Sequence, residues 1–506
     1  MKTVRLILFC LATPAFSAQA QTPCDSTGIL YRMAIHSDPV RETGASVFDH
    51  APAAQLYRYE ASLSTVGVQG ELRSENRAIL PAEGDGSLAG AFSARSYLRI
   101  DDRSAASAGA SYERGRTDGV RWNSTADYRL LRPYVLADSV GGDLSTEEYA
   151  FNGQYMRRDG RISYGLGIDY RARHEYRQSD PRPHNIVDDI QGILGAGWNT
   201  DGYLFAASAR GRIYKQTQAL KFFDTKGANA VEYLMTGLGS YIDRYYGGEE
   251  MSILYKGRSY GARLTVVPTG ATGWSAAVDY ERFRMEPLFS KLNYVAAGRL
   301  VRQTLSAAVR HCGSRATAAI EAEYELRQGF ENVIENASTA DYRILGDFAM
   351  YRSRTLRARA HGAVAWRRAH SSFVLLPQAE WIGTSTDYRY PYRSVAFSTL
   401  DGGCDLSFAL ERSRSRLRVT AGGRYLHRLG QRIELDDPTL PPAQRSLLAT
   451  TVGRVSDSRF ALRGEFRWER MLSHSSALLL AVRYRPAFYD GGVRVHRALL
   501  QAAVCF

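Results

Sequence analysis

The chain has 506 residues, with 65 lysines and arginines against 52 aspartates and glutamates, and its mean hydropathy is −0.31. This composition excludes a disordered or collagen-like chain, and it is too polar for a bundle of membrane-spanning helices. The positive charge is almost all arginine, and it is scattered along the chain with no recognised nucleic-acid motif. We therefore predict no nucleic-acid partner.

Residues 1–20 have the three-part layout of a secretory signal peptide. Lys2 and Arg5 precede a short apolar run, and Ala18-Gln19-Ala20 provides a small-residue cleavage site. The apolar run is shorter than the roughly 20 residues that a helical anchor needs, and no later stretch reaches that length. The mature chain is therefore either a soluble exported protein or a β-barrel.

Long stretches of the chain alternate between apolar and polar residues with a period of two, which is typical of β-strands. The pattern runs from Arg161 to Arg173 and recurs in residues 315–327, 356–367, 416–428 and 459–469. Strands of soluble sandwiches have about 5 to 6 residues, whereas a strand that crosses an outer membrane needs about 9 to 11. The length of these segments favours a transmembrane barrel.

We predict an all-β protein whose residues 53–506 form a single transmembrane antiparallel β-barrel. Residues 21–52 precede it as a periplasmic or luminal segment that could form a small hatch. At roughly 22 to 24 residues per strand, the barrel would have about 18 to 22 strands, with 20 as the best estimate. Short periplasmic turns would alternate with longer extracellular loops, expected at residues 175–185, 216–248, 386–392 and 430–457.

Turns and aromatic residues support this division. Dipeptides such as Asp159-Gly160 and Asp401-Gly402 predict tight hairpins, because Gly and Asp tolerate a positive φ. Aromatic residues near the expected strand ends are candidates for girdles at the two membrane interfaces: Trp198, Trp274, Trp366, Trp381 and Trp468.

In such a barrel the apolar face contacts lipid and the polar face points into the lumen. The predicted lumen-lining residues are Arg161, Arg171, Arg357, Arg359, Arg416, Arg418, Arg463, Arg467, Glu321, Glu323 and Glu325. Lumen arginines could create a positive field that attracts anionic solutes. Alternatively, arginines and glutamates pair across strands and fill the lumen.

The last segment alternates up to an aromatic residue at the chain end, with Leu500, Ala502, Val504 and Phe506 on one face. This looks like the C-terminal signature by which the outer-membrane assembly machinery recognises the last strand of a barrel. The segment therefore predicts location in the cell outer membrane, with membrane lipid and the barrel-assembly machinery as partners.

The mature chain also resembles the uncharacterised outer-membrane β-barrel proteins, a domain of unknown function, of Bacteroidota-type Gram-negative bacteria. Leu30-Tyr31-Arg32, Pro39-Val40 and Tyr57-Arg58-Tyr59 contribute to this resemblance. It implies the location and the fold, and it carries over no functional residue.

No catalytic residue, metal site or cofactor is predicted. The chain lacks G-x-S-x-G and H-E-x-x-H motifs, and Cys24, Cys312, Cys404 and Cys505 are too far apart for a metal-ligand motif. We therefore predict a non-enzyme, a porin-like channel or transporter for small anionic solutes.

Two alternatives remain open. One is a non-conducting surface-binding or scaffold barrel that acts with an unidentified periplasmic or surface partner. The other is a hatch-gated importer of hydrophobic compounds, as in fatty-acid transporters, although the Asn-Pro-Ala start of that family is missing. A TonB-dependent receptor would need a plug domain several times longer than residues 21–52.

Overall fold

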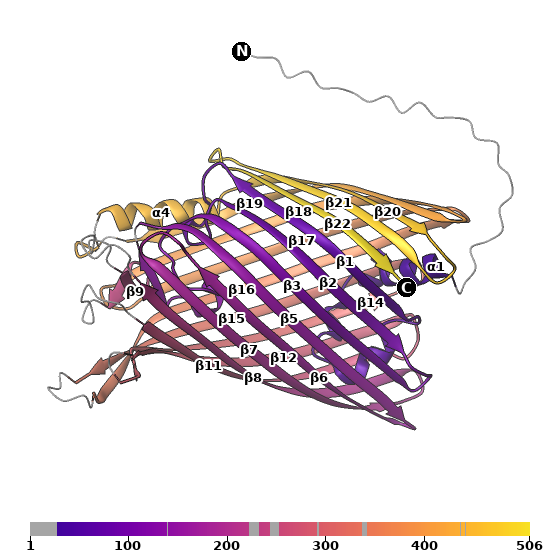
Figure 1. Cartoon of the computed structure of the whole chain (residues 1–506), viewed down its shortest axis with the longest axis horizontal. Helices are drawn as coiled ribbons and strands as arrows, with labels where there is room; N and C mark the ends of the chain where they lie inside the picture. The colour runs from indigo at the N-terminus through magenta and orange to yellow at the C-terminus, as the bar shows by residue number, and fades with distance from the viewer. Residues whose placement is uncertain are drawn as a thin grey trace, which may run out of the picture.

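Eighteen antiparallel strands close into a barrel in the computed structural model (Figure 1). The structure describes residues 28–506 except 139, 222–231, 243–251, 291–292, 336–341, 436 and 441. The predicted signal peptide and Cys24 lie outside the described residues. Described residues Cys312, Cys404 and Cys505 are free thiols.

Each barrel strand pairs with its neighbours in the sequence, and the ring closes where the last strand pairs with the first, from Thr65 opposite Cys505 to Glu75 opposite Val495. The strands are β1 (Leu63–Glu75), β2 (Gly86–Arg99), β3 (Ser104–Val120), β5 (Gly142–Asp159), β6 (Ile162–Tyr176), β7 (Arg182–Asn199), β8 (Tyr203–Lys221), β11 (Ser252–Pro268), β12 (Gly273–Phe289), β14 (Gly298–Cys312), β15 (Ala316–Ile334), β16 (Ile344–Arg368), β17 (Ser371–Tyr388), β18 (Arg393–Arg412), β19 (Ser415–Glu434), β20 (Arg459–Met471), β21 (Ala477–Tyr489) and β22 (Arg494–Cys505). A short strand, β13 (Val295–Ala296), pairs only with the end of β12. A separate sheet contains β4 (Val135–Asp138), β9 (Glu232–Gly237) and β10 (Ser240–Ile242).

The predicted fold class is confirmed, and the observed strand number lies at the lower limit of the predicted range. The best estimate of 20 strands was too high because the strands are longer than the periodicity indicated, up to 25 residues in β16. One expected turn, Asp401-Gly402, lies inside β18. A glycine without a positive φ is compatible with an extended strand, so the dipeptide alone does not locate a hairpin.

Short and long connections lie at opposite ends of the barrel. The start of β1 and Phe506 lie at one end, where Ser64 and Phe506 exchange backbone hydrogen bonds. Connections there are short, and residues 160–161 alone join β5 to β6. The long connections, residues 121–141, 222–251 and 435–458, lie at the other end. By the usual asymmetry of such barrels, the short-turn end is periplasmic and the other end is extracellular.

Two of the four expected long loops are wrong. Residues 216–248 and 430–457 overlap long connections, whereas β6 and β7 are separated only by residues 177–181, and β17 and β18 only by residues 389–392. Pro181 and Pro391 lie in the connections, whereas Pro183 is the second residue of β7. Proline thus marks the boundary of a strand without setting the length of the connection.

The outer face of the wall is apolar, as a lipid-facing surface requires. Leu194, Leu264 and Ile320 are each about two-thirds exposed. Trp198, Trp274, Trp366 and Trp468 all lie near the periplasmic ends of their strands, and Trp381 lies closer to the other end of β17. The tryptophans therefore lie where a periplasmic girdle and its extracellular counterpart are expected.

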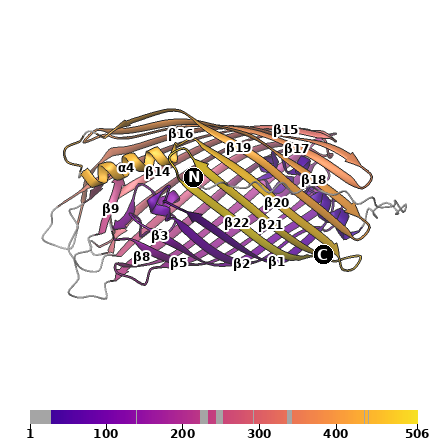
Figure 2. The same ribbon diagram turned by 90° about the horizontal axis from the view of Figure 1, so that it is seen from above.

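The helices of the described ranges are short. They are α1 (Ile29–His36), α2 (Pro39–Glu42), α3 (Tyr128–Leu131), α4 (Pro442–Val455) and the 3₁₀ helices η1 (Ala45–Phe48), η2 (Pro52–Tyr57) and η3 (Pro81–Glu83). None of these helices has the length and apolar character needed to cross a membrane. The helix α4, with 14 residues the longest of these, lies at the extracellular end of the barrel (Figures 1 and 2).

Residues 28–62, here called the plug, lie against the inner wall near the periplasmic end, where Figure 1 labels α1. Ile29 and Met33 pack in a cluster with β21 and β22, Val40 with β16 and β17, Phe48 with β8, β11 and β12, and Leu56 with β2, β3 and β5. The plug therefore contacts the wall on all sides. Accordingly the first strand begins at Leu63 and not at residue 53.

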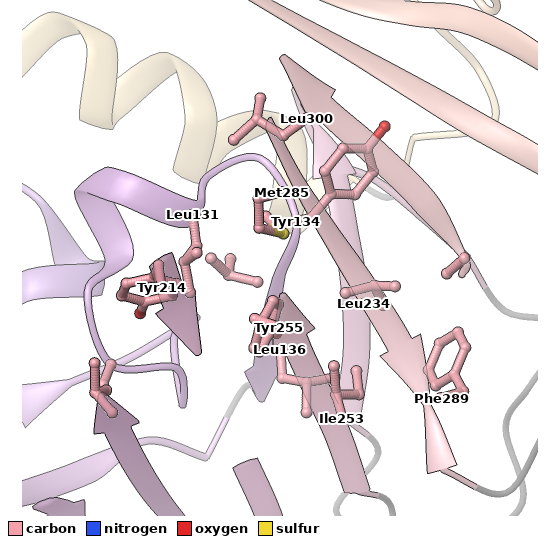
Figure 3. Close-up of a cluster of buried hydrophobic side chains, with 14 of the residues drawn as sticks. Leu131, Tyr134, Leu136, Tyr214, Leu234, Ile253, Tyr255, Met285, Phe289 and Leu300 are labelled. Carbon is pink, nitrogen blue, oxygen red and sulfur yellow. The ribbon is translucent and has the colours of Figure 1, made fainter. Parts of the chain in front are cut away.

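The connection of residues 121–141, here called the inward loop, folds into the lumen from the extracellular end. It contains α3 and β4, and β4 pairs with β9. Figure 3 shows Leu131, Tyr134 and Leu136 of this loop in one buried cluster with Tyr255 of β11 and Met285 of β12. The largest apolar cluster among the described residues thus lies inside the barrel, between a loop and the wall.

Candidate functional site

Along β8 the inner wall meets the plug first and the inward loop second. Ser208 donates a hydrogen bond to the carbonyl of His50 in the plug, at 2.6 Å. Six residues further along the same strand, the hydroxyl of Tyr214 donates to Asp127 of the inward loop, at 3.0 Å. The side chains between these contacts on the inner face of β8 lie between the two inserted segments.

The same order recurs along β15, four strands further round the barrel from β8. The hydroxyl of Thr317 donates to the carbonyl of Val40 in the plug, at 2.8 Å. Further along the strand, the guanidinium of Arg327 donates to the carbonyl of Arg132 in the inward loop, at 3.2 Å. Two separate strands therefore place the plug and the inward loop at two successive levels of the lumen.

A polar cavity of about 320 Å³, here called the chamber, adjoins the plug on its extracellular side. The plug contributes Ser46, Asp49 and His50, and the charged wall residues are Arg210, Arg263, Asp279, Glu281, Glu321, Glu323, Arg357 and Arg359. Four arginines thus face five carboxylates, counting Asp49. The charge of the chamber is nearly balanced, so its lining alone selects no anion.

The chamber wall contains a buried ion-pair network. Both terminal nitrogens of Arg210 donate to the carboxylate of Asp279, each at 2.6 Å, and Arg263 lies 3.5 Å from the same carboxylate. All three residues are more than nine-tenths buried. Glu281 adds a second acidic partner, 3.7 Å from Arg210 and 3.6 Å from Arg302. In such a network the wall arginines are bound to carboxylates and are therefore not free to bind a solute.

Three wall arginines hold the plug by its backbone. Each donates a charge-assisted hydrogen bond to a plug carbonyl: Arg263 to Ser46 at 2.6 Å, Arg310 to Arg41 at 2.5 Å and Arg418 to Ser37 at 2.7 Å. These bonds come from β11, β14 and β19, so they anchor the plug at three points around the barrel. The role of Arg418 as an anchor could not be deduced from alternation, because its acceptor is a backbone carbonyl far away in the sequence.

The structure places most of the predicted lumen residues in pairs with each other or with nearby carboxylates. Arg357 lies 3.2 Å from Glu323, and Arg359 lies 2.9 Å from Glu380. Glu321 accepts a hydrogen bond from Ser46 of the plug at 2.5 Å. These contacts match the alternative in which arginines and glutamates pair across strands.

The remaining predicted residues follow the same pattern. Their contacts are Arg171 with Asp127, Glu148 and Asp189; Arg416 with Glu411; Arg463 with Asp405 and Glu465; Arg467 with Glu469; and Glu325 with Arg327. Arg161 is the exception. It lies in the turn between β5 and β6, exposed and beyond the end of the strand, contrary to the prediction, because the alternating pattern continues past the last paired residue.

A second cavity of about 490 Å³, here called the periplasmic pocket, contacts other residues of the plug. Its charged lining comprises the arginines Arg41, Arg58, Arg99, Arg158 and Arg310 and the carboxylates Glu42, Glu60 and Asp102. Arginine is in excess here, five against three. Among the described residues, the buried Nε atoms of Arg58 and Arg310 have no hydrogen-bond partner. The excess of arginine gives the pocket the positive charge that favours an anion.

The plug closes on itself next to this pocket through an aromatic contact. The ring of His36 stacks on Tyr59 with centroids 4.0 Å apart, and its Nε2 lies 2.7 Å from the carbonyl oxygen of Ala61. Burial is the largest cause that lowers the pKa of His36 from 6.5, and Arg58, Arg32 and Arg41 lower it further. Burial also raises the pKa of Tyr59 to about 12. Both groups are thus neutral at pH 7.

Acid is expected to loosen the plug. In the undocked plug His36 regains its ordinary pKa of 6.5, so the undocked form binds the proton more tightly than the docked form does. The free energy that holds the plug in place is therefore at its full value above pH 6.5. It decreases as the pH falls below 6.5 towards the lower pKa that His36 has in the docked plug. His50 adds to the effect, because burial lowers its pKa too.

The measurement is the open time of single barrels in a planar bilayer, recorded from about pH 8 to about pH 5, the range in which histidine titrates. Replacing both residues in the variant His36→Gln with His50→Gln is expected to flatten the pH dependence. An equally steep dependence in that variant would contradict this assignment and would point to the carboxylates of the plug.

Solved structures with a similar outline are distant in sequence. The ferric preacinetobactin receptor BauA from Acinetobacter baumannii has 9% identity and a TM-score of 0.41, covering 88% of this chain and 79% of its own. A bacterial polysaccharide outer membrane secretin has 10% identity and a TM-score of 0.36, covering 88% and 97%. A FadL homologue of Pseudomonas aeruginosa has 11% identity and a TM-score of 0.33, covering 92% and 94%. These likenesses are too weak to indicate what this chain carries.

A family model gives a direct assignment. No curated protein matches the chain in sequence. The model of the family of unknown function DUF6850, however, matches residues 52–504, which include every strand of the barrel except the last residue of β22. The chain therefore belongs to the DUF6850 family of unknown function.

Proposed function

We propose that this protein is a gated outer-membrane transporter for small, polar, anionic solutes, in which the plug is the gate. The observation that carries the proposal is the division of the lumen. The plug and the inward loop occupy two levels, the chamber adjoins one side of the plug, and the periplasmic pocket lies against other plug residues. A solute would pass between the two cavities only when the plug shifts.

The size and polarity of the two cavities support a small polar solute. Volumes of about 320 and 490 Å³ fall in the lower part of the range of small-molecule sites. Both cavities are lined by charged side chains, which disfavours the alternative of an importer of hydrophobic compounds. A permanently open porin is disfavoured as well, because wall arginines are committed to plug carbonyls and to carboxylates.

The anionic preference rests on the periplasmic pocket and not on the arginine-rich wall. The wall arginines of the chamber are balanced by carboxylates, whereas the pocket has five arginines against three carboxylates. The Nε atoms of Arg58 and Arg310 are unpartnered but buried, so they would become donors for a carboxylate or phosphate oxygen when the plug shifts.

The test is to lock the plug to the wall with a disulfide. A Cβ built on Gly44 of the plug lies 2.6 Å from the Cβ of Ala319 on β15, so the pair Gly44→Cys and Ala319→Cys needs only a small shift to reach the usual separation of about 3.5 to 4.5 Å. Currents are recorded in a planar bilayer in mild urea, which we expect to weaken the contacts of the plug before it unfolds the barrel. A salt gradient reports the ion preference.

The reduced protein is expected to open with a preference for anions, and the oxidised protein is expected to stay closed until reductant is added. Gly44→Cys alone is the matched control, because Gly44 has a φ of +69° and any side chain there adds strain with or without the bond. Openings that persist after oxidation would show that the plug is not the gate. A reduced barrel that never conducts would instead favour the non-conducting scaffold.

A further inference from the structure

A third cavity lies on the outside of the barrel, away from the lumen. It is an open groove of about 470 Å³ over β15 to β19, lined by Tyr324, Arg354, Leu356, Trp381, Gly383, Gly430 and Arg432 among others. Here we call it the outer groove. Tyr324 and Leu356 alternate along their strands with Glu323, Glu325 and Arg357, which face the lumen, so the groove faces the membrane.

Two glycines create the hollow. A Cβ on Gly383 would lie 2.7 Å from Cη2 of Trp381, so the indole ring lies across this glycine and forms one wall. A Cβ on Gly430 would meet nothing closer than the hydroxyl of Ser398, at 3.8 Å, so the surface there is open. Between them the wall is recessed where the neighbouring strands carry large apolar side chains.

The upper rim of the groove lies at the level of the outer lipid headgroups. A strand tilted by about 40° rises roughly 2.5 Å per residue along the membrane normal, so an apolar band of about 25 Å takes about ten residues. Counted along β16 from Trp366 at the periplasmic interface, ten residues lead to Leu356. The next outward-facing positions are Arg354 and Arg352, both exposed.

The rim carries a cation that the protein leaves available. None of the described carboxylates forms an ion pair with Arg354, whereas Arg432 is paired with Glu434. Arginine binds phosphate through two parallel hydrogen bonds, and its guanidinium is always charged. An arginine above an apolar groove matches a molecule with a phosphate at one end and a hydrocarbon chain at the other.

We propose that the outer groove binds a phosphorylated glycolipid of the outer leaflet, with one acyl chain between Trp381 and Gly430 and a phosphate on Arg354. The site is independent of the proposed gate, because its residues face away from the lumen. The bound lipid would cover the recess with hydrocarbon and neutralise the rim.

The experiment is native mass spectrometry of the full-length folded barrel in detergent, titrated with bisphosphorylated lipid A and with its dephosphorylated form. One phosphorylated lipid per barrel is expected to survive mild activation. Arg354→Gln is expected to weaken binding about tenfold, the loss of one charge-assisted hydrogen bond. Gly430→Leu is expected to abolish binding by filling the groove, since a side chain fits there without a clash.

Arg258→Gln is the matched control. Like Arg354, Arg258 is an exposed arginine near the extracellular end of its strand, but it lies in β11, outside the groove. Heat-dependent migration on a gel verifies that each variant is folded. Three outcomes would each overturn the proposal: equal binding of the dephosphorylated lipid, unchanged binding by Arg354→Gln and Gly430→Leu, or an equal loss of binding in Arg258→Gln. Each of them is expected for lipid that surrounds the barrel without a specific site.

Discussion

Replacing the three anchor arginines by methionine, in the triple variant Arg263→Met, Arg310→Met and Arg418→Met, is expected to raise the open-to-closed ratio of the barrel about a thousandfold. Methionine keeps much of the length of the side chain and removes the donor. Each lost bond from a charged donor to a plug carbonyl costs at least about 1.5 kcal/mol, so three together cost at least about 4.5 kcal/mol.

The measurement is the open time of single barrels in a planar bilayer without denaturant. The barrel wall itself is expected to remain folded, because Arg210 still donates two hydrogen bonds to Asp279 when Arg263 is replaced. The matched control replaces Arg357 by methionine, since Arg357 pairs with Glu323 and does not bond the plug. If the triple variant opens no more often than this control, the plug is held by its apolar clusters, and the gate has to be sought in the inward loop.

Asp279→Asn is expected to destabilise the barrel by about 3 to 5 kcal/mol, the usual cost of leaving buried cations without their counter-charge. Asp279 accepts two hydrogen bonds from Arg210 and lies 3.5 Å from Arg263. The amide of asparagine can accept only one of these bonds and carries no charge. The urea concentration at which the folded barrel loses its β-structure in detergent measures the effect.

Asp143→Asn is the control for this prediction, and its effect should stay below about 1 kcal/mol. Asp143 also pairs with an arginine, Arg116, but both side chains are more than two-fifths exposed. Similar losses in the two variants would show that the network around Asp279 is wet, and that the chamber is open to bulk water.

The wall of the barrel could be predicted from the sequence because each side chain of a membrane-spanning strand faces one of only two environments, lipid or the lumen. The alternation from Arg161 to Arg173 contains most of β6, and the alternation in residues 315–327 corresponds to the first part of β15. The position of Phe506 on the outer face also followed from alternation, and its backbone pairs with Ser64. Lipid on one side and polar lumen on the other impose period two directly.

The contents of the lumen could not be predicted in the same way, because their contacts join distant parts of the chain. Residues 121–141 contain Leu131, Tyr134 and Leu136, which are fully buried, and this apolar content was the one signal that the loop does not face water. The excess of arginine was visible, but the acceptors of Arg310 and Arg418 are plug carbonyls, and backbone carbonyls leave no trace in a sequence.

The position of the plug also has a consequence for how the protein is made. Ile29 and Met33, near the start of the chain, pack in one cluster with Leu479 and Ala503, near its end, while β1 pairs with β22. The docking site of the first helix therefore exists only after the last strand has been synthesised. A chain that stops before β22 lacks both the strand that pairs with β1 and part of the surface that contacts α1. Barrel closure and plug docking therefore both depend on the synthesis of β22.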